Sequence, residues 1–135
     1  RVGYHGKYEW FGKPSARFDD IINLIPARLT ALLLVAAAAL IKGCHAVDGW
    51  RAAWNDCTQC ESPNAGWPMS AMAGLLGIIL EKKGMYRLGC SIVPVGKEIL
   101  PSPAHLRRGQ QVAQLAVALA AAVAVLVLSV TEYYS

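Results

Sequence analysis

An uncharged apolar run at positions 109–131 constrains the fold of this 135-residue chain more than any other feature. Gln114 and Ser129 are the polar side chains of its central part. An α-helix needs about 20 consecutive apolar residues to cross the hydrocarbon core of a bilayer. Arg107 and Arg108 precede the run and two tyrosines follow it, which is typical of the two membrane–water interfaces. The run predicts a membrane-spanning helix rather than a buried helix of a soluble protein.

The composition of the whole chain agrees with a membrane protein. Hydrophobic residues make up 55% of the sequence and charged residues 16%, against about 25% charged residues in ordinary soluble domains. Such a chain is too apolar to be intrinsically disordered, and its four cysteines are too few for a disulfide-dense secreted domain. The length allows one domain, so we expect residues 1–135 to form a single membrane-embedded domain.

A second apolar stretch covers residues 29–41, between Arg28 and Lys42. It is short for a crossing, but helical periodicity extends it backwards to Ile21. Pro26 would then bend the helix or mark its start. Two interpretations stay open. Either polar groups with a function lie at membrane depth, or a surface helix becomes a spanning helix at Arg28.

The third apolar stretch, residues 62–80, carries no charge and is rich in glycine and alanine. Small residues allow helices to approach closely. Pro63 and Pro68 prevent a regular helix over its full length, so we expect a helix from about residue 69 to residue 82. That helix is short for a crossing, and a re-entrant or packed helix fits the pattern equally well.

The distribution of positive charge tests the topology. If all three stretches cross, residues 1–28 and 81–110 share one side and hold eleven Lys and Arg, against two on the other side. The positive-inside rule favours that arrangement. If the middle stretch does not cross, the division is five against eight, which decides little. In both cases the sequence predicts an all-α fold, an integral membrane helical bundle with polar connecting loops, spanning the cell membrane more than once.

The cysteines and the basic residues give weak signals. Cys57 and Cys60 form a CxxC pair, but a zinc site needs two further ligands. The nearby candidates, Cys44 and His45, are adjacent in sequence and would ligate one ion awkwardly. The net charge of +4 comes without a Lys/Arg cluster that interleaves with aromatic residues, so we expect no nucleic-acid partner.

A polar cluster precedes the second apolar stretch. Asp19 and Asn23 are four residues apart, and Asp20 and Asn23 share a helical face. Paired carboxylates with a carboxamide suit an oxygen-coordinated Mg²⁺. Arg28 would add a guanidinium fork for phosphate or carboxylate. The alternative is structural, with the carboxylates complementing a helix end and the arginine reaching the interface.

A second polar phrase, SPNAGWP, opens the third apolar stretch at Ser62. Ser and Asn are preferred at helix N-caps, and Pro suits the first helical turn. The N–H groups of such a helix start form a natural anion site, to which Ser62 and Asn64 would belong. A plain turn leading into a helix has the same composition, so both interpretations stay open.

Two phrases together resemble a known family. FDDIINLIPARLTALLL, followed by SPNAGWPMSAMAGLLGIILEKKGMYRLG, is similar to the cobalamin-biosynthesis CobD/CbiB family, adenosylcobinamide-phosphate synthase. EWFGK and the closing apolar helix are also in place, and the chain resembles the C-terminal portion of these longer proteins. The family often carries Arg-Asp upstream of its SPNAGW phrase, where this chain has Asn55 and Asp56. Cys57 and Cys60 are not part of the family pattern.

The resemblance implies an integral membrane ligase that acts late in corrinoid assembly. It would join a carboxylate of adenosylcobyric acid to aminopropanol, or to its O-phosphate, as an amide, with ATP activating the carboxylate. The protein would contribute positioning and charge neutralisation. On this basis we assign Asp19 and Asp20 to Mg²⁺–ATP, Asn23 to orienting them, and Arg28 to clamping a phosphate.

The resemblance assigns Ser62 and Asn64 to binding phosphate or substrate, and Glu81 to holding the amine. Because ATP is cytosolic, both phrases should meet on the cytosolic side, which favours a middle helix that does not cross. The alternative function is a non-catalytic membrane scaffold or sensory relative of the family. Such a protein would bind corrinoid or other corrinoid-pathway proteins.

Overall fold

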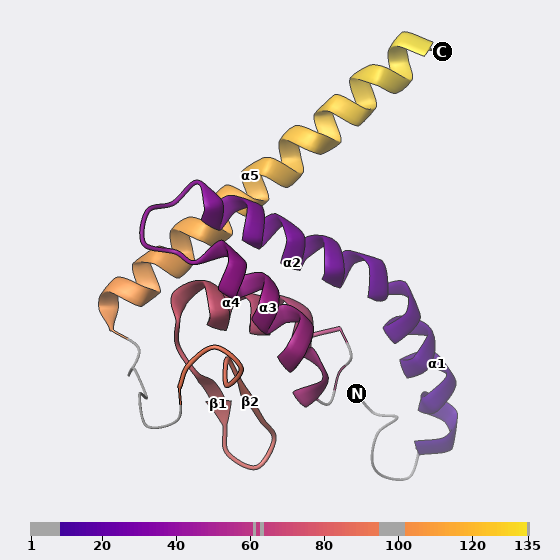
Figure 1. The fold of residues 1–135 in the computed structure, drawn as a ribbon. Coiled ribbons are helices and arrows are strands. Elements are labelled where there is room, and N and C mark those ends of the chain that lie inside the picture. The colour runs from indigo at the N-terminus through magenta and orange to yellow at the C-terminus, as the bar shows by residue number, and fades with distance from the viewer. Residues whose placement is uncertain (1–8, 61, 63, 95–101, 135) are drawn as a thin grey trace.

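The computed structural model describes residues 9–60, 62, 64–94 and 102–134. The chain is mostly helical, which confirms the all-α prediction, with one small two-stranded hairpin (Figure 1). The elements in chain order are α1 (Glu9–Ile22), α2 (Leu24–Ala39), α3 (Ala46–Asp56), the 3₁₀ turn η1 (Cys57–Gln59), α4 (Gly66–Leu76), β1 (Leu80–Lys82), β2 (Tyr86–Leu88) and α5 (Pro103–Tyr134).

The helices α1 and α2 follow one another with a single-residue break at Asn23. Pro26 has no N–H group, so the carbonyl of Ile22 loses its usual helical donor four residues ahead. The bonds on either side persist, because Asn23 N–H donates to the Asp19 carbonyl and Ala27 N–H to the Asn23 carbonyl, both at 3.0 Å. Pro26 therefore lies in the first turn of α2 and marks its start, one of the two predicted outcomes.

The helix α4 differs from its prediction at both ends, since it covers Gly66–Leu76 and not residues 69–82. Pro68 falls in the first turn, where N–H groups lack intrahelical partners, so it does not delay the start. Gly77 adopts a left-handed φ of 63°, which ends the helix before β1. A helix of 11 residues is about 16 Å long, too short to cross about 30 Å of hydrocarbon.

The tightest packing joins α3 to α4 as an antiparallel pair. A Cβ atom added at Gly74 would overlap the carbonyl of Asp48, and one added at Gly49 would overlap the side chain of Leu75. At the other end of the pair, the backbone of Gly66 lies against the carbonyl of Cys57. The predicted role of small residues of the third apolar stretch in close approach is confirmed at Gly66 and Gly74.

The helix α2 lies across this pair and contributes to two buried clusters. One surrounds its C-terminal half and also includes α5, and the other surrounds its N-terminal half. The members are Leu34, Ala37, Ala38, Leu75, Val112 and Ala116 in the first cluster, and Ala31, Ala53, Cys57, Trp67 and Ala71 in the second.

Two helical segments, Lys13–Ala39 and Pro103–Tyr134, are long and apolar enough to cross a membrane. The first half of α5 packs on α2, whereas every residue from 121 to 134 is exposed. That second half projects away from the rest of the molecule (Figure 1). An exposed apolar helix of this kind suggests a membrane protein by its length and composition.

Gly66→Ala tests the packing of α4 on the 3₁₀ turn. The added methyl group would overlap the backbone carbonyl of Cys57, so the backbone must shift, and we expect a loss of about 2–3 kcal/mol of unfolding free energy. Gly109→Ala is the matched control, because its new Cβ would meet Leu76 at an ordinary 3.4 Å. Chemical unfolding in detergent micelles measures the free energy of unfolding of both variants. Equal stability of the two would contradict this packing.

Candidate functional site

The polar cluster of the first phrase lies in the last turn of α1 and at the break before α2. Asn23 Nδ2 donates to Asp19 Oδ1 at 3.0 Å, the four-residue pair that the sequence predicts. No side chain caps the start of α2, so neither carboxylate has the structural role of an N-cap there. Asp19 is exposed and Asp20 is half-buried, because neighbouring positions point about 100° apart on a helix.

Asn64, from the second phrase, contacts this turn directly. Its Nδ2 donates to the backbone carbonyl of Asp20 at 2.7 Å, and the residue is 7% exposed. A carbonyl only accepts hydrogen bonds, so the amide nitrogen must face Asp20 and the amide oxygen must face elsewhere. That oxygen, Oδ1, is buried without a hydrogen-bond partner among the described residues. A buried acceptor left unpaired costs about 1–3 kcal/mol.

Arg28 brings a positive charge to the same place. Its Nη1 donates to the carbonyl of Leu24 at 2.8 Å, and its Cζ lies 4.9 Å from the centroid of the Trp67 ring. Trp67 in turn meets the edge of Trp54, with ring centroids 5.5 Å apart. Stacking on an aromatic face orients the guanidinium and leaves its remaining N–H groups exposed to a ligand.

Ser62 shapes the turn before α4. Its Oγ accepts the N–H groups of Asn64 and Ala65, each at 3.4 Å. The N-cap residue of α4 is Ala65, and no side chain caps the helix. Of the two interpretations left open for this phrase, the structure therefore shows the plain turn that leads into a helix, and the side-chain cap is wrong. The same bonds occupy two of the N–H groups that an anion would otherwise use, so Arg28 is left as the main anion-binding group here.

The two phrases thus meet in space, as predicted. Asn64 joins the second phrase to the end of α1, and Trp67 joins it to the start of α2 through Arg28. We call Asp20, Arg28, Ser62 and Asn64 the junction group. Its members come from positions as far as 44 residues apart in the chain, yet they lie at one corner of the fold.

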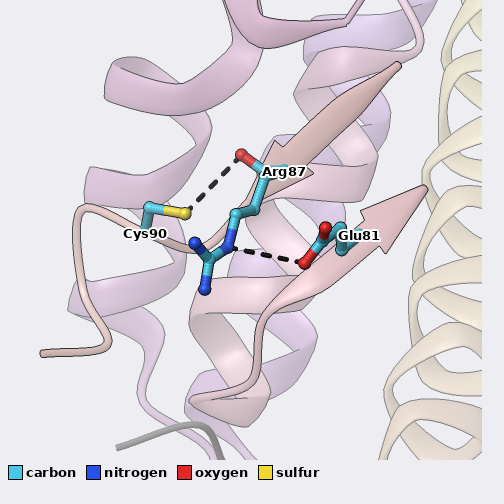
Figure 2. A network of polar contacts seen from close by, with 3 residues as sticks. All are labelled: Glu81, Arg87 and Cys90. Atoms are coloured by element: carbon cyan, nitrogen blue, oxygen red, sulfur yellow. Dashed lines mark hydrogen bonds and ion pairs between the residues drawn. The ribbon is translucent and has the colours of Figure 1, made fainter. Parts of the chain in front are cut away.

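Glu81 lies outside the junction group. It is on β1 opposite Arg87 of β2, and its carboxylate pairs with Arg87 Nε at 3.6 Å on an exposed hairpin (Figure 2). Cys90, which follows the hairpin, donates its thiol to the Arg87 carbonyl. A half-exposed ion pair contributes little stability. The predicted role of Glu81 in holding the amine receives no support from this position, and it stays a prediction.

Asp56 is a buried carboxylate that the sequence does not single out. It is 2% exposed, and its Oδ2 accepts the N–H groups of Gly89 at 2.8 Å and Ser91 at 3.3 Å. The Ser91 hydroxyl donates to the same oxygen at 3.1 Å, and Gln59 Nε2 donates to Oδ1 at 3.3 Å. Asp56 therefore fastens the segment after the hairpin to the end of α3.

The cysteine pair gives no sign of metal or thiolate chemistry in the part of the chain that the structure describes. The thiol of Cys57 is buried and faces the carbonyl of Trp54 at 3.6 Å. Burial raises the pKa of the Cys60 thiol, which keeps it protonated at neutral pH. No group of three or more His, Cys, Asp or Glu that could hold a metal ion occurs among the described residues.

Comparison with known proteins gives consistent matches. Residues 1–113 match the family described as CobD/Cbib protein. The cobalamin biosynthesis protein CobD of Dehalococcoides mccartyi is 52% identical over 94 residues, which cover 70% of this chain and 30% of that protein. The probable cobalamin biosynthesis protein CobD of Methanocaldococcus jannaschii is 40% identical over 101 residues, which cover 73% of this chain and 32% of that protein. No solved structure matches.

The two matches also define how much of a relative is present. This chain spans 30% and 32% of the length of these two relatives, and the family match includes α1 to α4, the hairpin and the first part of α5. Both phrases, and with them the whole junction group, lie inside the matched residues. The chain belongs to the CobD/CbiB family.

Proposed function

We propose that this chain forms part of an enzyme of cobalamin biosynthesis, an ATP-dependent ligase. It would join a carboxylate of adenosylcobyric acid to aminopropanol, or to its O-phosphate, as an amide. The observation that carries the proposal is the junction group, in which Asn64 joins the second phrase to the end of α1 and Trp67 orients the guanidinium of Arg28. An amide acceptor and a cation on these two phrases would suit a substrate that carries both an N–H or O–H donor and an anionic group.

The chemistry requires positioning more than a nucleophile from the protein. A carboxylate does not react with an amine until one of its oxygens is converted into a leaving group, and phosphoryl transfer from ATP would supply that step. Arg28 would then neutralise negative charge on the phosphate or carboxylate. Asn64 Oδ1 would accept a hydrogen bond from the amine or hydroxyl of aminopropanol. The geometry favours this acceptor role for Asn64 over phosphate binding.

The same proposal places nucleotide beside the end of α1. Mg²⁺ in nucleotide sites is held by one or two carboxylates, with phosphate oxygens and water completing the shell. Asp19 and Asp20 supply two carboxylates at the end of α1, so they fit a metal shared with ATP better than a closed protein cage. Asn23 would orient Asp19 through their hydrogen bond. Because ATP is cytosolic, the junction group would face the cytosol.

Asp20→Asn in a full-length protein that carries this sequence tests the metal assignment. Removing the charge should lower the rate of amide formation at least about 10-fold and raise the Mg²⁺ concentration needed for half-maximal rate. Asp48→Asn is the control, since Asp48 is also half-buried but lies on α3, away from the junction group. The rate of amide formation by each purified variant is measured as a function of Mg²⁺ concentration. Wild-type rates and an unchanged magnesium midpoint would contradict the assignment.

A second function is a non-catalytic scaffold or sensory protein that binds corrinoid. The matched residues cover 30% of a relative, so part of a catalytic site can lie outside them, and the two functions need an experimental distinction. Complementation distinguishes the two functions. A strain lacking the amidation step should grow on cobyric acid when given the longer protein, with or without rescue by the 135-residue chain. If neither rescues growth, the ligase proposal fails and the scaffold remains.

A further inference from the structure

Two tryptophan side chains are exposed next to each other on α3. Trp50 is 40% exposed and Trp54 is 65% exposed, and their ring centroids lie 6.2 Å apart. Tryptophan is highly buried on average in folded proteins, so a pair of adjacent exposed indoles is unusual. An indole presents a flat apolar face, which is a common contact surface for ligands and partners. We call Trp50 and Trp54 the tryptophan face.

The surroundings of the tryptophan face are partly polar. The exposed residues of α3 are Val47, Trp50, Arg51, Trp54 and Asn55. Arg51 is three positions before Trp54, so the two side chains are neighbours on the helix surface, and Asn55 follows Trp54 directly. A guanidinium and a carboxamide are unfavourable among lipid chains. They suit a ligand that has polar groups around a flat ring.

The tryptophan face continues to the cation of the junction group. Trp54 contacts Trp67 with ring centroids 5.5 Å apart and ring planes at 86°, and the Arg28 guanidinium lies 4.9 Å from the Trp67 centroid. One ring therefore separates Trp54 from Arg28. Trp67 is buried, whereas Trp54 and Arg28 are both exposed. A ligand that stacks on Trp54 could present an anionic group to Arg28.

The angle between the two indoles indicates the size of the ring that would stack there. Trp50 and Trp54 are inclined by 37°, so they do not form one flat platform. A corrin ring is much broader than an indole and would need both rings in one plane. Adenine is a fused five- and six-membered ring system like indole, and it can stack on Trp54 alone. Aromatic side chains bind nucleobases in this way.

We propose that Trp54 binds the adenine of a nucleotide, with the phosphate chain directed towards Arg28. The inference rests on the proposed function, in which ATP activates the carboxylate, and it adds a contact to the base. Arg28 supplies the charge complementarity, because a guanidinium attracts phosphate. Trp50, inclined beside Trp54, would border the base on one side.

Steady-state kinetics of a full-length protein that carries this sequence test the proposal, with ATP and adenosylcobyric acid varied separately. Trp54→Leu keeps an apolar side chain and removes the ring. We expect the KM for ATP to rise at least about five-fold, as for the weakest base–aromatic stacks, while kcat stays nearly constant. Trp54→Phe should retain most of the affinity. Val47→Ala, at an exposed position of the same helix, is the control and should change neither constant.

Inorganic tripolyphosphate separates a contact with the base from an effect through Arg28. It carries the charge of the ATP phosphates without a base, and its inhibition constant against ATP is measured with Mg²⁺ present. In Trp54→Leu this constant should stay at the wild-type value. Equal losses of affinity for tripolyphosphate and ATP would show that Trp54 only positions Trp67 and Arg28, which would overturn the proposal. A higher KM for adenosylcobyric acid with an unchanged KM for ATP would place the corrin on this face and would also overturn it.

Photolabelling applies if the variant does not fold or if the protein forms no amide. The unmodified protein is irradiated with 8-azido-ATP, and the labelled peptides are identified by mass spectrometry. Label within residues 46–60 that ATP displaces would support the base contact. It would do so even where no amide is formed and the proposed ligase function fails. Label confined to other segments, or label that ATP does not displace, would refute the proposal.

Discussion

Asp56→Ala should destabilise the protein by about 3–4 kcal/mol, the largest stability loss that we expect from a single side-chain truncation. The carboxylate is buried at the end of α3 and accepts the N–H groups of Gly89 and Ser91. Alanine leaves these donors without their acceptor, and each buried donor left unpaired costs about 1–3 kcal/mol, with bonds to charged groups at the upper end. Asp56→Asn keeps one acceptor oxygen, so about half of the loss should remain.

The control for this prediction is Asp48→Ala, which removes a half-buried carboxylate from the first turn of the same helix. It should cost about 0.3–1 kcal/mol through the helix dipole. Thermal unfolding in detergent measures the stability of each variant, and amide hydrogen exchange reports the local effect. The amide of Gly89 should exchange faster in Asp56→Ala before the rest of the chain does. Equal losses for Asp56→Ala and Asp48→Ala would contradict the anchoring role.

The long apolar helix α5 and the helical class could be predicted because they depend on local composition. The apolar run in α5 exceeds the length of a bilayer crossing, and nothing in tertiary structure is needed to identify it. The end of α4 could not be placed, because Gly77 and the residues after it are apolar and fit a helix equally well. The left-handed φ of Gly77 and the pairing of Leu80 with Leu88 end that helix. Neither feature changes the hydrophobic periodicity of the sequence.

The local contacts of the candidate site could be predicted from the sequence, but the long-range contacts between its segments could not. The bond between Asp19 and Asn23 follows from helical spacing, and the turn at Ser62 is the plain-turn alternative that the composition left open. The contact that joins the two phrases uses the backbone carbonyl of Asp20 as acceptor. Every residue has a backbone carbonyl, so the amino-acid sequence does not indicate which one is used. The role of Asp56 was missed for a related reason, since two of its four hydrogen-bond donors are backbone N–H groups over 30 residues away in the chain.

Asn64→Ala in a full-length protein should reduce kcat/KM for amide formation by at least about 100-fold. The substitution removes two interactions together. The bond to the Asp20 carbonyl holds the second phrase against α1, and Oδ1 is the buried acceptor that we assign to the amine or hydroxyl of the substrate. Sites that hydrogen-bond a reacting group lose about two to three orders of magnitude when one such group is removed.

Asn64→Asp separates these two contributions, because it retains an acceptor oxygen at the substrate side and loses the N–H donor to Asp20. If Oδ1 binds the amine, the aspartate variant should keep a KM for aminopropanol close to wild type while its kcat falls, and the alanine variant should lose both. Asn55→Ala, at an exposed asparagine of α3, should change neither constant more than about two-fold. A higher KM in both Asn64 variants would assign the residue to positioning α1. Wild-type constants in both would remove Asn64 from the site, because a buried acceptor that contacts substrate cannot be lost without effect.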